Sequence, residues 1–230
     1  MGVCGERFPY REACPGRPGG TNREGMVGMF MQLIQGKVAD EARLQELMDR
    51  WRRDLEPGAT GYLGTTSGSC DDGTYLALVR FASAEDARRN SNRPEQAAWW
   101  REAEQCFDGP VTFMDCPQVT FWMQGGSDDA GFVQVMEGHA SDPNRIMQLL
   151  NMSGERMHQL RPEIIGSTFS TTPAGDYIEA VYFTSEAEAR DHEAMDLPAD
   201  MQATFEEIMQ QMGEVTYLDL HHPRMITAGN

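Results

Sequence analysis

The sequence predicts an α+β protein built from two copies of one β-α-β-β-α-β unit, packed against each other sheet to sheet. Three observations predict this fold. Residues repeat at an offset near 102, each copy has the same order of apolar runs and helical stripes, and each second helix opens with the same capping pattern. We expect the first unit at residues 26–123, a linker at residues 124–130 and the second unit at residues 131–230.

The repeat is visible as matched residues at nearly constant spacing. The offset is 102 through the first strand, 105 after the first helix, 102 again in the third strand and 104 in the fourth. Because the offset changes only between elements or within helices, it follows the pattern of insertions in a duplicated fold. The matched pairs include Gln32 and Gln134, Gly61 and Gly166, Tyr75 and Tyr177, Phe81 and Phe183, and Val111 and Val215.

Apolar periodicity predicts the first strand and first helix of each unit. Runs at residues 29–34 and 132–136 have strand length and are typical of strands covered on both faces. The helix that follows the first run carries its apolar residues on one stripe, at Leu44, Leu47, Met48, Trp51 and Leu55. Pro57 and Pro162 end the two first helices.

The remaining elements of each unit follow from turn and capping signals. Residues 62–67 and 74–81 predict a hairpin in the first unit. Ser83 and Ser185 each open a capping box, in which the hydroxyl accepts from an unpaired helical amide and an acidic residue three positions later reaches back. Fourth strands are predicted at residues 111–114 and 215–218, and an apolar stretch at residues 119–123 fits an additional strand.

Composition excludes several classes of function. Nineteen basic and 36 acidic residues give a net charge of −17, so nucleic acid and anionic membranes would be repelled. No stretch has the ~18 apolar residues of a membrane span, and no signal-peptide run is present, so we expect a cytoplasmic protein. Five cysteines at unpatterned spacings predict neither disulfides nor a metal site. Residues 1–25, rich in Gly, Pro and Arg, are expected to form a disordered tail.

The order β-α-β-β-α-β is that of the ferredoxin-like unit, an antiparallel sheet with two helices on one face. Residues 80–87 and 182–189 each show a strand that ends in an aromatic residue, followed by Ser and acidic residues that open a helix. The Trp99-Trp100 pair and the Val-Thr start of each fourth strand complete the pattern. On these motifs the chain resembles the dimeric α+β barrel superfamily, and within it the antibiotic-biosynthesis-monooxygenase-like group, over nearly all of its length after residue 26.

The resemblance implies that the two units face each other sheet to sheet around a cavity, so that the fused chain is a pseudo-dimer. It implies a small apolar or aromatic molecule as partner, with cofactor-independent oxygenase activity in some members and haem degradation in others. Phe81 and Phe183 stand where those enzymes often have Trp, which departs from the pattern. We therefore expect no cofactor, with haem as the lower-ranked alternative. A non-catalytic binding module with a filled barrel remains the other interpretation, and either a monomer or a homodimer fits.

Two groups of residues are candidates for a site. Gln32 and Gln134 are polar residues within apolar strands, and either a ligand or a neighbouring side chain can supply partners for their amides. His192 lies in the second-helix region, where the resemblance places an iron ligand; it is the candidate catalytic residue, with a surface histidine as the alternative. Aromatic residues that fit either a pocket lining or the core are Tyr75, Phe81, Trp99, Trp100, Phe169, Tyr177 and Phe183.

Overall fold

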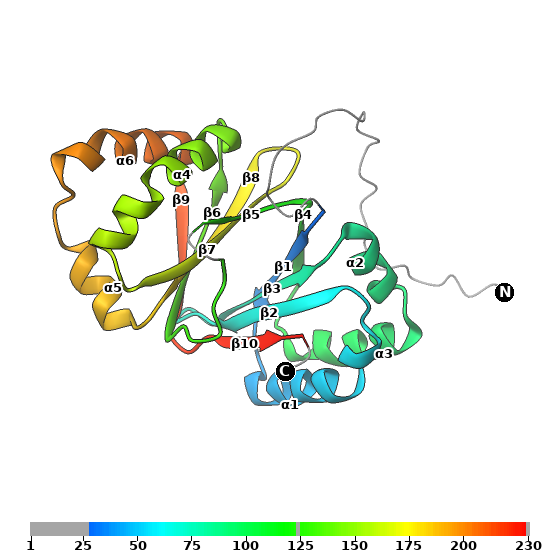
Figure 1. The fold of residues 1–230 in the computed structure, drawn as a ribbon. Coiled ribbons are helices and arrows are strands. Elements are labelled where there is room, and N and C mark those ends of the chain that lie inside the picture. Colours follow the sequence, from blue (N-terminus) through cyan, green and yellow to red (C-terminus); the bar gives the residue numbers. More distant parts are fainter. Residues whose placement is uncertain (1–27, 123–124, 229–230) are drawn as a thin grey trace.

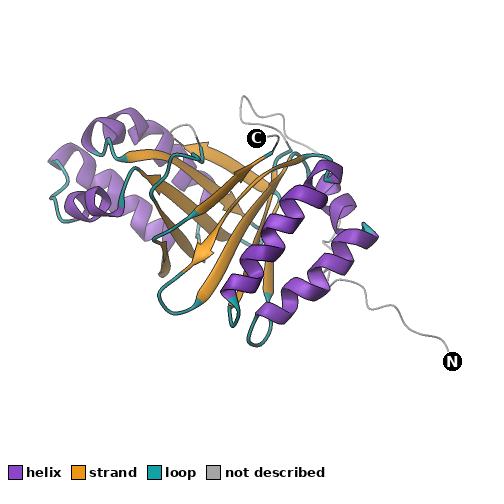
Figure 2. Cartoon of the chain, turned by 90° about the horizontal axis from the view of Figure 1, so that it is seen from below, coloured by secondary structure: helices purple, strands orange, loops and turns teal. Residues whose placement is uncertain are grey.

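The computed structural model describes residues 28–122 and 125–228 of the chain. Two five-stranded antiparallel sheets face each other, and helices cover the outer face of each sheet (Figures 1 and 2). This arrangement confirms the predicted α+β fold of two units packed sheet to sheet. The predicted disordered tail, residues 1–25, lies outside the described residues.

The two units contain the same elements in the same order. The first unit comprises β1 (Phe30–Lys37), α1 (Glu41–Asp54), β2 (Tyr62–Ser69), β3 (Thr74–Phe81), α2 (Ala84–Ser91), α3 (Pro94–Ala103), β4 (Thr112–Cys116) and β5 (Gln118–Trp122). The second comprises β6 (Phe132–His139), α4 (Pro143–Leu160), β7 (Ile164–Thr171), β8 (Asp176–Phe183), α5 (Glu186–Glu193), α6 (Ala199–Met212), β9 (Val215–Leu220) and β10 (Arg224–Thr227). Short 3₁₀ turns follow α1 and α3, at Glu56–Gly58 and Glu104–Cys106.

Helix starts follow the capping chemistry of the sequence. Ser83 accepts a hydrogen bond from the amide of Asp86 at 3.1 Å, and Ser185 accepts one from the amide of Glu188 at 3.3 Å. These bonds satisfy amides that have no partner within the helix. The capping role of both serines is therefore confirmed, and the carboxylates of Asp86 and Glu188 reach back to the serine hydroxyls at 2.6 Å and 2.9 Å.

Each sheet receives one strand from the other unit. The strand orders are β10-β2-β3-β1-β4 and β5-β7-β8-β6-β9. Strand β5 follows β4 along the chain but pairs with β7, and β10 follows β9 but pairs with β2. The apolar stretch that follows the fourth strand is thus a strand, as predicted, and it pairs with the opposite unit.

A β-bulge at a glycine marks the place where each crossing strand approaches. Gly64 lies opposite Arg80 and Gly166 lies opposite Tyr182, each just after a register shift. A β-carbon at Gly64 would lie 2.6 Å from the carbonyl oxygen of Ile226, and one at Gly166 would overlap a neighbouring carbonyl. Gly166 is therefore the counterpart of Gly64 at an offset of 102, and the match of Gly166 to Gly61 was wrong.

Apolar side chains fill the centre of the space between the two sheets. Alternate residues of the central strands point into this layer, and most are completely buried. They include Met31, Leu33, Leu76, Leu78, Val133, Val135, Ile178 and Ala180. The expectation of a ligand cavity at the centre of this layer is therefore wrong, and the interpretation of a barrel filled by its own side chains holds there.

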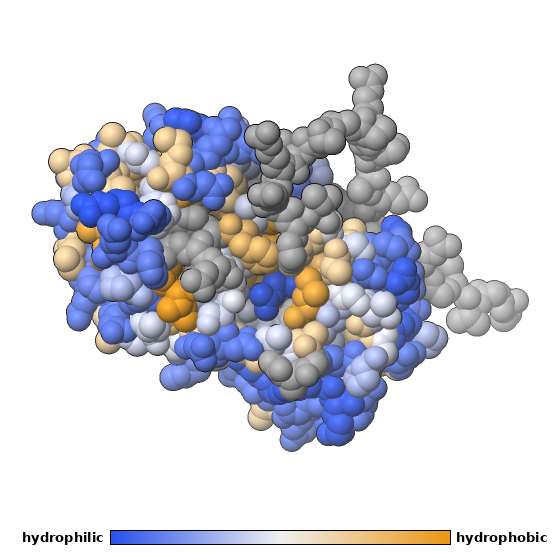
Figure 3. All heavy atoms as spheres, in the orientation of Figure 1, coloured by the Kyte–Doolittle hydropathy of each residue, from blue (hydrophilic) through white to orange (hydrophobic). Residues whose placement is uncertain are grey.

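The outer faces of the sheets carry separate cores beneath the helices. In the first unit, Trp51 contacts Tyr62 edge to face at a ring distance of 4.9 Å, and Tyr62 contacts Phe81 at 5.7 Å. Trp99 donates its ring N–H to the carbonyl of Leu47 at 2.8 Å, so its polar atom is satisfied within the core. On the face drawn in Figure 3, hydrophobic residues gather near the middle of the molecule and the helical ends are mainly hydrophilic.

Candidate functional site

The two strand glutamines lie on the helix-covered faces. Gln32 donates to Asp115 at 2.7 Å, and Gln134 donates to Asp219 at 3.0 Å. Their neighbours along the strands, such as Met31 and Leu33, are the residues that face the opposite sheet. Both glutamines therefore point away from the space between the sheets, and the interpretation in which each bonds a neighbouring side chain is confirmed. Their contact with a ligand stays a prediction.

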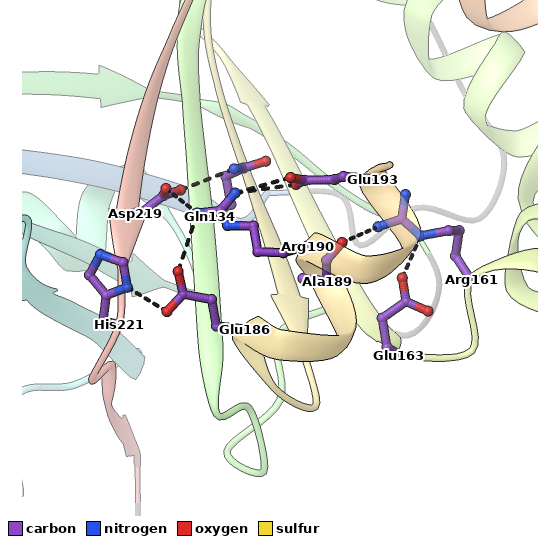
Figure 4. A network of polar contacts seen from close by, with 9 residues as sticks. All are labelled: Gln134, Arg161, Glu163, Glu186, Ala189, Arg190, Glu193, Asp219 and His221. Atoms are coloured by element: carbon purple, nitrogen blue, oxygen red, sulfur yellow. Dashed lines mark hydrogen bonds and ion pairs between the residues drawn. The ribbon is translucent and has the colours of Figure 1, made fainter. Parts of the chain in front are cut away.

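Asp219 connects Gln134 to a wider polar network in the second unit (Figure 4). Arg190 on α5 binds Asp219 and also Glu193, its neighbour one turn later. Nδ1 of His221 donates to the carboxylate of Glu186 across 2.6 Å, and this contact raises the pKa of the imidazole. The network fastens α5 to the edge strand β9, a structural task for these charges.

His192, near the end of α5, lies beside Glu163. Its Nδ1 is 2.8 Å from Oε2 of Glu163, an ion-pair distance although the angles are not those of a hydrogen bond. Glu163 also binds Arg161, and its side chain is 2% exposed. The counterpart of His192 is Asn90, which accepts from Arg93 at 2.9 Å. The catalytic role of His192 stays a prediction.

The predicted aromatic residues fall into two groups. Phe81, Trp99 and Phe183 are buried in the cores beneath the helices, and Trp100 packs partly buried against Phe113 at a ring distance of 5.2 Å. These residues form the core, as one interpretation of the sequence held. Tyr75 and Tyr177 occupy equivalent positions in the two units. Phe169 packs against Tyr177 in the core of the second unit.

A groove of about 210 Å³ opens between α1 and β2 in the first unit. Helix α1 contributes Glu41, Leu44, Gln45 and Met48; β2 contributes Ser67, Gly68 and Ser69; β3 contributes Tyr75; and the crossing segment of the second unit contributes His222 and Arg224. Both halves of the chain therefore build its walls. Tyr75 is the predicted site residue that the structure places there.

One difference between the copies lies in the wall of this groove. Ser67 lies opposite Ala77 in the first sheet, and Phe169 lies opposite Glu179 at the same place in the second. Phe169 stacks on Tyr177 with a ring distance of 5.6 Å and an angle of 17° between the rings. A serine in this position leaves the corresponding face of Tyr75 free of an aromatic partner from β2.

The groove has an apolar floor and a polar rim. Burial raises the pKa of the Tyr75 phenol, and a hydrogen bond with Ser67 partly offsets this effect, so the phenol is neutral at physiological pH. On the rim, Ser69 donates to Glu41 at 2.7 Å. Arg224 binds Asp49 and donates to Gln45 at 3.2 Å. An aromatic body and a polar substituent would both find matching surroundings here.

A buried carboxyl group, Glu179, lies beneath the helices of the second unit. Its residue is 4% exposed, and it accepts a hydrogen bond from Ser167 at 3.0 Å. Burial raises the pKa of Glu179 to about 7, with the Ser167 hydrogen bond acting in the opposite direction. Sequence reasoning missed this residue, although an acidic residue at the place of Ala77 in an otherwise apolar strand was a visible signal.

His222, Arg224 and Ser67 were also missed from the sequence. The first two belong to a segment near the end of the second copy, and only the crossing of β10 brings that segment to the first sheet. The correspondence of Ser67 to Phe169 is visible only from the strand registers of the two sheets, in which they occupy equivalent positions of β2 and β7. No local pattern around these residues indicated a site.

Fold and site together define a fused, pseudo-dimeric α+β barrel with a groove on the helix side of its first unit. Among solved structures, the chain is similar to a candidate monooxygenase from Lactobacillus acidophilus NCFM, with a TM-score of 0.68, 11% identity and coverage of 88% of this chain and 97% of that one. It is similar to a candidate monooxygenase from Fusobacterium nucleatum subsp. nucleatum, with a TM-score of 0.69, 8% identity and coverage of 89% and 96%.

A third similar structure is that of an anthrone oxidase-like protein, with a TM-score of 0.63, 11% identity and coverage of 90% of this chain and 97% of that one. At these identities the similarity establishes the shared tandem fold. No protein-family model and no curated protein sequence matches the chain. Within the described residues, no helix is long and apolar enough to cross a membrane.

Proposed function

We propose that this chain binds a small aromatic molecule in the groove between α1 and β2, as a small-molecule-binding protein of the antibiotic-biosynthesis-monooxygenase-like type. The observation that carries the proposal is the groove itself, which has Tyr75 as part of its floor and serine where the other unit has Phe169. Its volume of about 210 Å³ is below that of drug-sized pockets, so it suits a molecule of about one or two rings.

The lining specifies the chemistry of the ligand. Leu44, Met48 and Tyr75 offer apolar and aromatic surface to a ring. His222 and the paired Ser69 and Glu41 offer hydrogen-bonding groups at the rim. A phenol or a quinol, with an apolar body and a hydroxyl at its edge, matches both parts.

Blocking the groove tests this proposal directly. Ser67→Phe introduces the residue that the second unit has at this position, and its ring lies where the ligand would bind. Gln45→Trp places a large side chain at the rim of the groove, from an exposed position of α1, without changing the core. With 1-naphthol as the probe, we expect binding measured by calorimetry to weaken at least tenfold in both variants. Ala42→Phe, on the exposed side of the same helix, is the matched control and should bind like the unmodified chain. Normal binding by two folded groove variants would refute the proposal.

A catalytic form of this proposal is cofactor-independent monooxygenation. It is supported by the fold shared with proteins described as candidate monooxygenases and as anthrone oxidase-like. In such a reaction a ring CH₂ group loses a proton, its carbon reacts with O₂, and one oxygen atom becomes a carbonyl while the other leaves as water. Because the substrate supplies the electrons, no cofactor is needed. Among the groove side chains, the imidazole of His222 is the usual type of general base.

Oxygen uptake distinguishes catalysis from simple binding. With 1-naphthol as substrate, whose keto tautomer has a ring CH₂ group, we expect uptake by the unmodified chain and its loss in Ser67→Phe. Binding of 1-naphthol without oxygen uptake would identify a non-catalytic binding module, the second candidate function. That candidate is favoured by the filled layer between the sheets.

A further inference from the structure

The connection between β9 and β10 carries part of the groove wall from the second unit to the first. It consists of His221, His222 and Pro223, and β10 begins at Arg224. His222 and Arg224 line the groove, and Arg224 pairs in register with Ser67 of β2. The placement of two groove residues therefore depends on how firmly this connection is held.

His221 is the polar anchor of this connection. Neither His222 nor Pro223 makes a hydrogen bond to another residue that the structure describes. Nδ1 of His221 lies 2.6 Å from Oε2 of Glu186 on α5, the contact drawn in Figure 4. Its Nε2 lies 3.4 Å from Oδ1 of Asp71, in the turn between β2 and β3. One imidazole thus links the connection to an element of each unit.

The surroundings of the imidazole favour its protonated form. From β6 the uncharged ring of Phe132 packs against it, with a ring distance of 5.9 Å. The charged groups that face it come from α5, from the turn between β2 and β3 and from β9, and they are Glu186, Arg190, Asp71 and Asp219. Three of these four are carboxylates, and the single cation among them is bound to Asp219 and Glu186.

This balance of charge sets the pH at which the anchor changes. The contact with Glu186 raises the pKa of His221 above its ordinary value of 6.5; Asp71 and Asp219 act in the same direction, and partial burial opposes them. The protonated ring can donate to both neighbouring carboxylates, whereas the neutral ring has a single N–H. Deprotonation therefore removes one of the two contacts and the positive charge from both.

We propose that His221 is a pH-sensitive lock on the connection between β9 and β10, and through it on the groove. The imidazolium holds the connection against Glu186 and Asp71 and so keeps His222 and Arg224 in the groove wall. The lock is closed below pH 6.5 and opens as the pH rises through the raised pKa of His221. Its effect on ligand affinity rests on the proposed function of the groove, whereas its effect on the connection does not.

Hydrogen exchange of the full chain tests the lock without any ligand. Protection factors, which are corrected for the intrinsic pH dependence of exchange, are compared for residues 221–227 at pH 6 and pH 8.5. In the unmodified chain we expect protection to fall about threefold or more at the higher pH, because local opening becomes easier. His221→Gln cannot change its charge and should show equal protection at both pH values. Glu186→Gln should move the change to lower pH.

A second histidine paired with a carboxylate provides the control. His139 lies 3.0 Å from Asp176, outside the connection, and His139→Gln should behave like the unmodified chain. The same fall in protection in His221→Gln as in the unmodified chain would overturn the proposal, and so would equal protection at both pH values in the unmodified chain.

Ligand binding then tests the link between the lock and the groove. The probe is 1-naphthalenemethanol, because its hydroxyl group does not titrate in this range. Calorimetry should show binding about threefold or more tighter at pH 6 than at pH 8.5 in the unmodified chain, and equal affinities in His221→Gln. Binding without a pH dependence that His221→Gln removes would overturn the link to the groove. Absence of binding at both pH values would count against the proposed function, while the exchange result would still decide whether the lock exists.

Discussion

Single residues account for the chemical differences between the two units. Ser67, in the wall of the groove, stands where the second unit has Phe169, and Ala77 stands where the second unit has the buried carboxyl group of Glu179. Both differences occur at adjacent, paired positions of the two central strands beneath the helices. Two substitutions between the copies therefore accompany a groove in the first unit and a titratable core residue in the second.

Glu179 makes stability depend on pH. Burial raises its pKa from an ordinary value of 4.5 to about 7, so folding disfavours the ionised form. The folded chain keeps its full stability below pH 4.5, where Glu179 is neutral in both states. It loses stability as the pH rises from 4.5 through 7, because the unfolded chain ionises more readily. The shift corresponds to a loss of about 3 kcal/mol. We expect Glu179→Gln to remove most of this loss between pH 5 and pH 8.

Chemical denaturation at pH 5 and pH 8 measures this effect. The free energy of unfolding of the unmodified chain should fall by about 3 kcal/mol more than that of Glu179→Gln. Glu46→Gln, on the exposed side of α1, is the control and should follow the unmodified chain. The same pH dependence in Glu179→Gln as in the unmodified chain would show that Glu179 is not the titrating group.

Elements follow local signals closely in this fold. Capping serines begin α2 and α5, and Pro94 and Pro198 stand at the starts of α3 and α6, so each predicted second helix is two shorter ones. Proline is tolerated there because the first amides of a helix have no internal partner. The bounds of these elements therefore come from backbone chemistry within a few residues.

The two capping serines offer a matched pair of tests at this scale. Ser83→Ala and Ser185→Ala each remove the hydroxyl that accepts from an amide of the first turn. Each should lower the free energy of unfolding by about 1 kcal/mol. Thr60→Ala, in an exposed turn, is the control in the same denaturation experiment. If neither serine variant lowered the free energy of unfolding more than Thr60→Ala does, water would replace the caps at no cost in stability.

The whole molecule is held together by exchanged strands and a shared apolar layer. Strand β5 closes the second sheet and β10 closes the first, so neither unit has its complete sheet without the other. Thr227 of β10 also donates to Asp128 in the connection between the units. The connection itself is therefore a minor part of what joins the halves.

Cutting the connection tests this view of the assembly. A protease site placed after Ser127 should yield two fragments that stay together, because separation would expose the buried layer and break both exchanged pairings. Size-exclusion chromatography should show the mass of the intact chain after cleavage, and two smaller species only in denaturant. Separation of the fragments in native buffer would contradict the proposed role of the exchanged strands.

The sequence by itself determined the duplication, the order of the elements, the caps and the sheet-to-sheet packing, since periodicity and capping act over a few residues. Only the tertiary structure decided which face each strand residue occupies. Gln32 and Gln134 are the example, because strands covered on both faces are apolar throughout and lose the alternation that distinguishes one face from the other. The groove also depends on β10 crossing to the first sheet, and such a long-range pairing leaves no local signal in the chain.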